Sequence, residues 1–200
     1  MQKIGIAGTI ASGKTSFALL LKRRGFPVFN CDSYARITRH NGHPACEKIK
    51  AVFPGTEDEH GDIDAAKLAS QVFHDEEKRK MLNAIVHPYV IEGMNHFFES
   101  HQDMPFVFAE VPLLFEAGLE EYFDTIIVVA CSEKTAVERM MRDRSYTEEE
   151  AEARYHAQIN KEEQIAKADI VIHNDGTLKE LDQKVNQMVG TLRRKARGRC

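Results

Sequence analysis

Short, mainly apolar segments recur along the chain and predict β-strands, and those at 106–110 and 125–130 are continuous runs without polar alternation. The segments span residues 4–7, 26–30, 106–110, 125–130 and 169–173. Strands covered on both faces, as in a parallel sheet, show such continuous β-branched runs, whereas half-exposed strands alternate. We therefore expect a parallel sheet of five strands.

Between these runs, apolar residues recur at the spacing of helices. Helices are expected over about 14–24, where Gly25 ends the helix, and over 132–142. Thr147-Glu148-Glu149-Glu150 is a capping box that opens a further helix. Strands that alternate with helices in this way predict a doubly wound α/β fold. The last helix, about 177–195, is expected to turn one apolar face inward, formed by Leu178, Leu181, Val185, Met188 and Leu192.

The stretch from 33 to 101 has helical periodicity and no convincing strand, which predicts a helical insertion between two strands of the sheet. Asp64 and Asp75 are expected to cap helices over 65–73 and 76–86. The dipeptide His87-Pro88 is expected to end the second helix, because the residue before proline resists the α conformation, and a new helix is expected to start at Pro88.

The first strand leads into Gly-Thr-Ile-Ala-Ser-Gly-Lys-Thr, residues 8–15. This is the phosphate-binding loop Gly-x-x-x-x-Gly-Lys-Thr, placed between a strand and a helix. Gly8 and Gly13 allow a tight turn whose N–H groups point at a phosphate, and the helix N-terminus adds to the positive field. Lys14 is expected to reach the β- and γ-phosphates, and the Thr15 hydroxyl to bind Mg²⁺. The alternative is a glycine-rich turn that merely carries a lysine.

Net charge, apolar runs and cysteine spacing exclude several classes of protein. The net charge of −4 gives no reason to expect nucleic acid or an anionic membrane as partner, and the basic end 193–199 is interpreted as a solvated tail. No apolar run is long enough for a membrane span, and no signal peptide precedes the first strand. Four cysteines without paired spacing suggest reduced thiols in a cytoplasm. His40, His43 and Cys46 lack a second cluster at metal spacing, so a polar surface helix is favoured over a metal site.

We interpret the predicted triphosphate-binding site as that of a kinase. A GTPase would need Asn-Lys-x-Asp after a strand, whereas Asn160-Lys161-Glu162-Glu163 ends in Glu and lies in a helical run. A chain of 200 residues is long enough for a core, an insertion that holds an acceptor and a mobile segment that carries arginines. Those parts suit a small-molecule kinase better than a motor or switch protein.

Two acidic residues follow strands at the edge where open α/β sheets bind ligands. Asp32 follows the second strand and Glu110 ends the third. Asp32 is expected to accept the proton of an acceptor hydroxyl, and the alternative is that it caps a helix starting at Ser33. Glu110 is expected to hold Mg²⁺ through water, or else to cap a helix or bind a substrate group.

The chain resembles the dephospho-CoA kinase family over most of its length. Beyond the phosphate loop, Pro-Leu-Leu-Phe-Glu at 112–116 and Ala-Asp-x-x-Ile-x-Asn-x-Gly at 168–176 carry the resemblance most specifically. Further matching positions are Asp32-Ser33-Tyr34-Ala35-Arg36, Gly61-Asp62-Ile63-Asp64, Leu68, Val72-Phe73, His87-Pro88, Arg139 and Gln158.

The resemblance implies transfer of the γ-phosphoryl of ATP, with Mg²⁺, to the ribose 3′-hydroxyl of dephospho-CoA, the last step of coenzyme A synthesis. It also implies three parts. These are a P-loop core (about 1–32, 102–115, 123–135 and 165–200), a helical CoA-binding insertion (about 33–101) and a helical lid (about 116–122 and 136–164).

The resemblance also implies roles for individual residues. Asp32 would face the ribose hydroxyl, Arg139 and Arg142 would come from the lid, and Asn174 would border the adenine. The alternatives are that the two arginines pair with nearby acids such as Glu138, and that His87 is a buried structural residue. The ATP site would further comprise Gly8, Thr9, Ile10, Ala11, Ser12, Gly13, Lys14 and Thr15, and the CoA site His87, Pro112, Leu113, Leu114 and Phe115.

Departures from the family pattern weaken some of these roles. Thr9 and Ala11 stand where glycine is usual, and both are expected to keep φ negative. Asn30 replaces an acid, which makes the field near Asp32 less negative. Asp143 stands where a lid arginine is usual, so Arg142 or Arg144 is expected to substitute for it. Gln164 replaces the lysine usual six residues after Gln158, and no role is assigned there.

Two rival functions remain from the sequence alone. One is another P-loop kinase, for a nucleoside, nucleoside monophosphate, shikimate or gluconate. The other is a nucleotide-binding regulatory module without transfer activity. A small-molecule acceptor is the expected partner, without nucleic acid or membrane, and the oligomeric state is left open.

Overall fold

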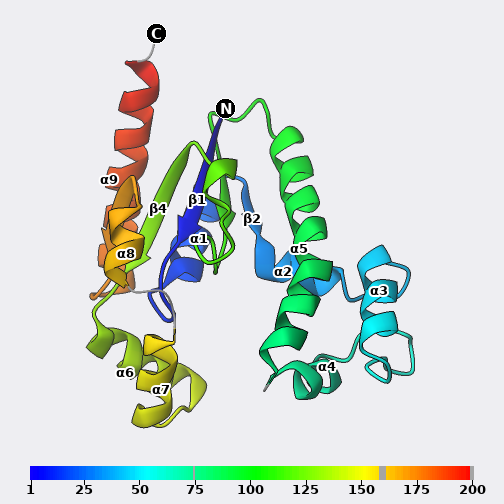
Figure 1. Ribbon diagram of the computed structural model, residues 1–200. Coiled ribbons are helices and arrows are strands. Elements are labelled where there is room, and N and C mark those ends of the chain that lie inside the picture. Colours follow the sequence, from blue (N-terminus) through cyan, green and yellow to red (C-terminus); the bar gives the residue numbers. More distant parts are fainter. Residues whose placement is uncertain (74, 158–160, 199–200) are drawn as a thin grey trace. The chain divides into compact units, whose positions relative to one another are not determined.

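The structure is a computed structural model that describes residues 1–73, 75–157 and 161–198 (Figure 1). The chain divides into two compact units. Residues Met1–Phe29 and His101–Cys200 form the sheet unit, and residues Asn30–Ser100 form the helical unit.

A five-stranded sheet runs through the sheet unit in the order β2-β3-β1-β4-β5. The central strand β1 pairs in parallel with β3 on one side and with β4 on the other, so that Ile6 lies opposite both Glu110 and Ile127. The next pair, β4 and β5, is also parallel. The predicted doubly wound sheet is therefore confirmed, with strands β1 (Gln2–Ala7), β2 (Val28–Asn30), β3 (Phe106–Glu110), β4 (Thr125–Ala130) and β5 (Ile170–His173).

The helices of the sheet unit begin where the sequence places capping residues. Ser132, Thr147 and Thr177 each accept a hydrogen bond from a backbone N–H of the first turn, and the last two form complete capping boxes. The helices are α1 (Lys14–Arg23), α6 (Glu133–Arg144), α7 (Glu148–His156), α8 (Lys161–Ala166) and α9 (Leu178–Arg197), with a 3₁₀ turn η1 (Glu120–Tyr122).

Helices α1 and α9 pack together over one face of the sheet. Alternate residues of the strands, such as Ile4 and Ile6, point into this core against Phe17 of α1 and Val185 of α9. The predicted inward face of α9 is confirmed except at Leu178, which is 57% exposed. Leu178 is the first residue of the helix, and Val189 completes the buried stripe.

The helical unit is built around one long helix. Helix α5 (Glu76–Glu99) packs against α2 (Cys31–Ile37), α3 (Pro44–Val52) and α4 (Ala65–Val72). The ring of Tyr34 lies directly on Gly93 of α5, where any larger residue would clash with it. The core between the other helices is formed by Cys46, Ile49, Phe53, Ile63, Leu68 and Val72.

The predicted aspartate caps are present. Asp64 accepts hydrogen bonds from the N–H groups of Ala66 and Lys67, and Asp75 accepts one from Lys78. These N–H groups hold the pKa of both carboxyls below its ordinary value. Each cap thus carries a negative charge at the positive end of its helix, which stabilises the helix start.

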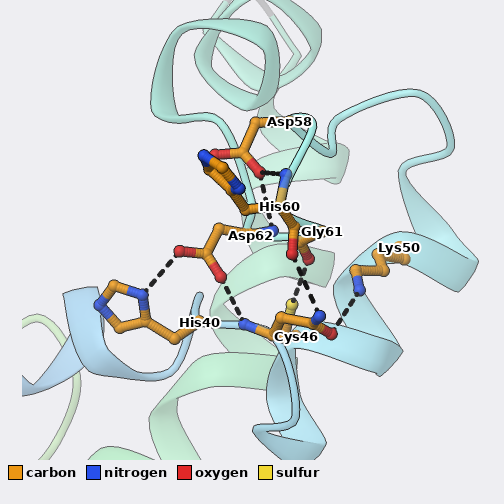
Figure 2. Close-up of polar contacts among 8 residues, drawn as sticks. His40, Cys46, Lys50, Asp58, His60, Gly61 and Asp62 are labelled. Carbon is orange, nitrogen blue, oxygen red and sulfur yellow. Dashed lines mark hydrogen bonds and ion pairs between the residues drawn. The ribbon is translucent and has the colours of Figure 1, made fainter.

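A polar cluster holds the turn at residues 57–63 (Figure 2). Asp62 accepts hydrogen bonds from Asn41 N–H (2.7 Å) and from His40 Nδ1 (2.9 Å). The Cys46 thiol donates to the Gly61 carbonyl. Cys46 is fully buried, so the expectation of a polar surface helix around His40, His43 and Cys46 is wrong at this position. In the described part of the chain, no three His, Cys, Asp or Glu side chains are grouped to hold a metal ion.

The predicted break at His87-Pro88 is wrong, because α5 continues through it over 24 residues. Proline removes the N–H that would bond the carbonyl of Ala84. Both Pro88 and Ala84 lie on the exposed face of the helix, where water can solvate that carbonyl. On the opposite face Leu82, Ile85 and other apolar residues pack on the helical core and keep the helix continuous.

Replacing Pro88 with alanine should therefore stabilise the protein. The exposed ring contributes little packing, and proline costs about 3 kcal/mol relative to alanine in a helix interior. Alanine also raises the conformational entropy of the unfolded chain, which offsets part of this gain. We therefore expect the free energy of unfolding to rise by about 1–2 kcal/mol. Urea denaturation measures this free energy, and a decrease would contradict the assignment of Pro88 as a destabilising residue.

Candidate active site

The phosphate loop connects β1 to α1 as predicted. Gly8 has φ 145°, and a Cβ there would lie 2.1 Å from the Val129 carbonyl oxygen of β4. Gly13 has φ 94° directly before α1, a conformation that side chains rarely adopt. These two glycines let the loop pass close to β4 and turn tightly into the N-terminus of α1.

Lys14 extends across this loop. Its ammonium donates to the carbonyls of Gly8 (2.7 Å) and Thr9 (2.9 Å). The charge is thereby held beside the loop that would cradle a phosphate.

The two residues predicted to bind metal lie in contact. The Thr15 hydroxyl donates to the Glu110 carboxylate at 2.6 Å, although 95 residues separate them in the sequence. Glu110 is 5% exposed. Hydroxyl and carboxylate oxygens are the donors that Mg²⁺ prefers, so this pair fits the ion.

The predicted negative φ is wrong for Ala11. Its φ is 55°, in the left-handed region, whereas Thr9 has no positive φ. Left-handed backbone costs about 1–2 kcal/mol for a residue with a Cβ. The loss is offset by packing, because Ala11 and Ile10 lie against Val137 and Met140 of α6.

A β-branched residue at position 11 should disable the loop. We expect Ala11→Val to weaken ATP binding at least tenfold, because a branched Cβ is poorly tolerated at positive φ. Ala11→Gly, which accepts this φ without strain, should keep ATP affinity within about threefold. Titration calorimetry with ATP compares them, and equal affinities of the two variants would contradict the strained loop.

The helical hairpin α6–α7 supplies residues near the loop that the sequence did not single out. Tyr146 and Tyr155 pack on the same small cluster as Ile10 and Ala11. The signal was present in the apolar residues at positions 10 and 11 of the loop, but their partners depend on how α6 and α7 pack.

Arg139 lies against the phosphate loop. Its guanidinium donates to the carbonyls of Ala11 (3.1 Å), Ser12 (3.4 Å) and Asn174 (2.9 Å). The structure thus brings Arg139 to the loop rather than into a surface pair with Glu138.

Asn174 lies on the other side of the same contact. Its side-chain amide donates to the Ser12 carbonyl at 2.8 Å, and its own N–H bonds the Ala130 carbonyl of β4. The residue is 6% exposed. Asn174 therefore contacts the phosphate loop directly.

Arg142 lies away from these contacts. It is exposed and pairs with the Asp143 carboxylate through two nitrogens, at 2.7 and 2.9 Å. The same pair holds the pKa of Asp143 below its ordinary value. Arg144 is also exposed and is the last residue of α6.

Asp32 lies in the first turn of α2, in the helical unit, and is exposed. The alternative that it caps this helix is wrong, because the side chain of Asn30 accepts the capping bond from Ser33 N–H at 2.7 Å. The amide that replaces the usual acid at position 30 therefore has a structural task, and the Asp32 carboxylate is not used as the cap.

The predicted CoA-site residues differ in exposure. His87 is half-buried in α5 of the helical unit, and burial lowers its pKa, so its imidazole is neutral at pH 7. In the sheet unit, Leu113 is 45% exposed while Leu114 and Phe115 are buried. Leu114 lies against Gly5 of β1, and Lys167 lies over the Phe115 ring. Pro112 is partly exposed.

Some predicted features lie outside the described residues, namely Gln158, Asn160 and Cys200. The other cysteines, Cys31, Cys46 and Cys131, are buried. No helix in the described ranges has the length and apolar character needed to cross a membrane.

Comparison with known proteins identifies close relatives. A family model described as dephospho-CoA kinase matches residues 2–180. A dephospho-CoA kinase of Bacillus cereus is 45% identical over 179 residues, which cover 88% of this chain and 89% of that protein. A crystal structure from Thermus thermophilus has a TM-score of 0.82 at 35% identity and covers 96% of this chain and 97% of its own. A dephospho-CoA kinase from Campylobacter jejuni, with a TM-score of 0.67 at 24% identity and the same coverage, shares the fold.

Proposed function

The chain belongs to the dephospho-CoA kinase family and phosphorylates dephospho-CoA with ATP; we propose that the residues described above bind the two substrates and that the phosphoryl group goes to the ribose 3′-hydroxyl. Two contacts support this proposal: the Lys14 ammonium bonds the phosphate loop, and the Thr15 hydroxyl beside it bonds the Glu110 carboxylate.

The loop N–H groups and Lys14 would hold the triphosphate of ATP. The Thr15 hydroxyl and the Glu110 carboxylate would hold Mg²⁺, Glu110 through water. The ion, when bound, neutralises charge on the phosphates. Lys14 adds its positive charge on the loop side, where its bonds to two carbonyls already place it.

Asp32 would orient the acceptor hydroxyl and take its proton. The residue follows strand β2, and ligands of open α/β sheets bind beyond the carboxyl ends of the strands. Because Asn30 serves as the helix cap, the Asp32 carboxylate is not committed to that bond.

The lid arginines would neutralise the transferring phosphoryl group. Arg139 starts from the edge of the loop, held by three carbonyls. Arg142 would first leave Asp143, which costs little because exposed ion pairs are worth about 0–1 kcal/mol.

The helical unit and the segment after β3 would bind dephospho-CoA. Leu113 offers an exposed apolar side chain for this task, and neutral His87 offers a donor or acceptor. Leu114 and Phe115 would act by holding the segment in place, because both are buried. We place the protein in the cytoplasm, which agrees with the buried thiols of Cys46 and Cys131 lying outside any disulfide.

An acceptor panel tests the proposal. ADP release is measured with ATP and Mg²⁺ in the presence of dephospho-CoA, shikimate, gluconate, a nucleoside or a nucleoside monophosphate. Release should depend on dephospho-CoA and exceed that with any other acceptor by a wide margin. Faster release with another acceptor would favour a different kinase, and nucleotide binding without acceptor-dependent release would favour a regulatory module.

A further inference from the structure

Two side chains from distant elements meet at the phosphate loop. Asn174 comes from the turn between β5 and α9, and Arg139 comes from α6. Both donate to the Ser12 carbonyl, at 2.8 and 3.4 Å, and the Arg139 guanidinium also bonds the Asn174 carbonyl. Helix α6, the turn after β5 and the phosphate loop are therefore joined by hydrogen bonds at one peptide of the loop.

That peptide joins Ser12 to Gly13. A trans peptide is planar, so its C=O and N–H point in opposite directions. Because the Ser12 carbonyl points at the Asn174 amide, the N–H of Gly13 must point the opposite way, away from Asn174. N–H groups in this orientation are what a phosphate-binding loop offers to its ligand.

The packing around Gly13 agrees with this role. A Cβ at Gly13 would lie 2.3 Å from the Asn174 amide nitrogen, so the amide rests directly on the glycine. Asn174 is buried and its backbone is tied to β4, which leaves its side chain little freedom. A rigid amide is suited to holding one peptide orientation at low entropic cost.

We propose that Asn174 is a positioning residue for the triphosphate: its side chain fixes the Ser12–Gly13 peptide and acts on phosphate binding, not on the adenine. Arg139 bonds the same carbonyl before it turns to the transferring phosphoryl group, so the Asn174 amide is the lasting contact. This rests on the proposed function only in that the loop binds a triphosphate, and it differs from the expectation that Asn174 borders the adenine.

Binding of inorganic tripolyphosphate separates the two roles, because this probe has no base. Titration calorimetry with Mg²⁺-tripolyphosphate, Mg²⁺-ATP and Mg²⁺-GTP is compared for the wild type, Asn174→Leu and Asn174→Ala. Leucine keeps the volume without a donor, and alanine removes the donor without overfilling the site. We expect both variants to bind tripolyphosphate and ATP about five- to tenfold more weakly, the effect of one lost hydrogen bond, with an unchanged ratio of ATP to GTP affinity.

Thr177→Ala is the matched control. Thr177 lies three residues after Asn174 and caps α9, so this change removes the helix cap and leaves the net charge unchanged. It should lower the melting temperature while tripolyphosphate affinity stays within about twofold. This separates a general loosening of the turn from the loss of the Ser12 contact.

Two outcomes overturn the proposal. Unchanged tripolyphosphate affinity in both Asn174 variants, with or without weaker ATP binding, would remove the positioning role. A collapsed preference between ATP and GTP would assign the side chain to the base. Since tripolyphosphate binding needs no acceptor, a failure here is distinguishable from a failure of the dephospho-CoA assay.

Discussion

Asp32→Asn is expected to lower kcat by about 10²–10⁴-fold while ATP affinity stays within about threefold. The amide keeps the shape of the side chain but cannot accept the proton of the acceptor hydroxyl, and general bases contribute rates of this size. Because Asn30 caps α2, the change leaves the helix start intact. Steady-state kinetics with dephospho-CoA and calorimetry with ATP provide the two measurements.

Glu92→Gln is the matched control for Asp32→Asn. It neutralises an exposed carboxylate on α5 of the same unit and has no role in our account. We expect near wild-type kcat for it. Near-normal turnover in Asp32→Asn would remove Asp32 from the reaction, and equal losses in both variants would point to a general effect of charge.

Lys14→Met is expected to weaken ATP binding by about tenfold or more and to lower kcat by about 10²–10³-fold. The ammonium is held beside the loop by two carbonyls, and methionine matches its length without its charge. A positioned charge at the transferring group is worth more in the transition state than in the ground state, so kcat should fall as well as affinity.

Lys22→Met is the control for Lys14→Met, since Lys22 is exposed near the end of the same helix. It should leave both constants within about twofold. Unchanged ATP affinity in Lys14→Met would contradict the role assigned to the loop. Melting temperatures of both variants exclude unfolding as the cause.

Local patterns in the sequence predict the elements of this fold because their causes are local. Continuous apolar runs gave the strands, and side chains such as Thr147 and Asp64 satisfy the first N–H groups of their own helices. The rule for proline is equally local, but it failed at Pro88 because packing on the opposite face of α5 outweighs one missing hydrogen bond.

The contacts of the active site likewise divide into those that follow from strand order and those that depend on tertiary packing. The contact between Thr15 and Glu110 follows from strand order, since the phosphate loop and Glu110 lie at the carboxyl ends of neighbouring parallel strands. The left-handed Ala11 and the bonds from Arg139 and Asn174 to Ser12 depend on how α6 and the last turn pack on the loop. Spacing along the chain does not encode that packing, so these contacts required the structure.

The identity of the product tests the central claim most directly. The protein is incubated with ATP, Mg²⁺ and dephospho-CoA, and the product is examined by mass spectrometry and ³¹P NMR. We predict one added phosphoryl group on the ribose 3′-oxygen, formed in equal amount with ADP. ADP formed without phosphorylated acceptor, or a phosphoryl group at another position, would contradict the account.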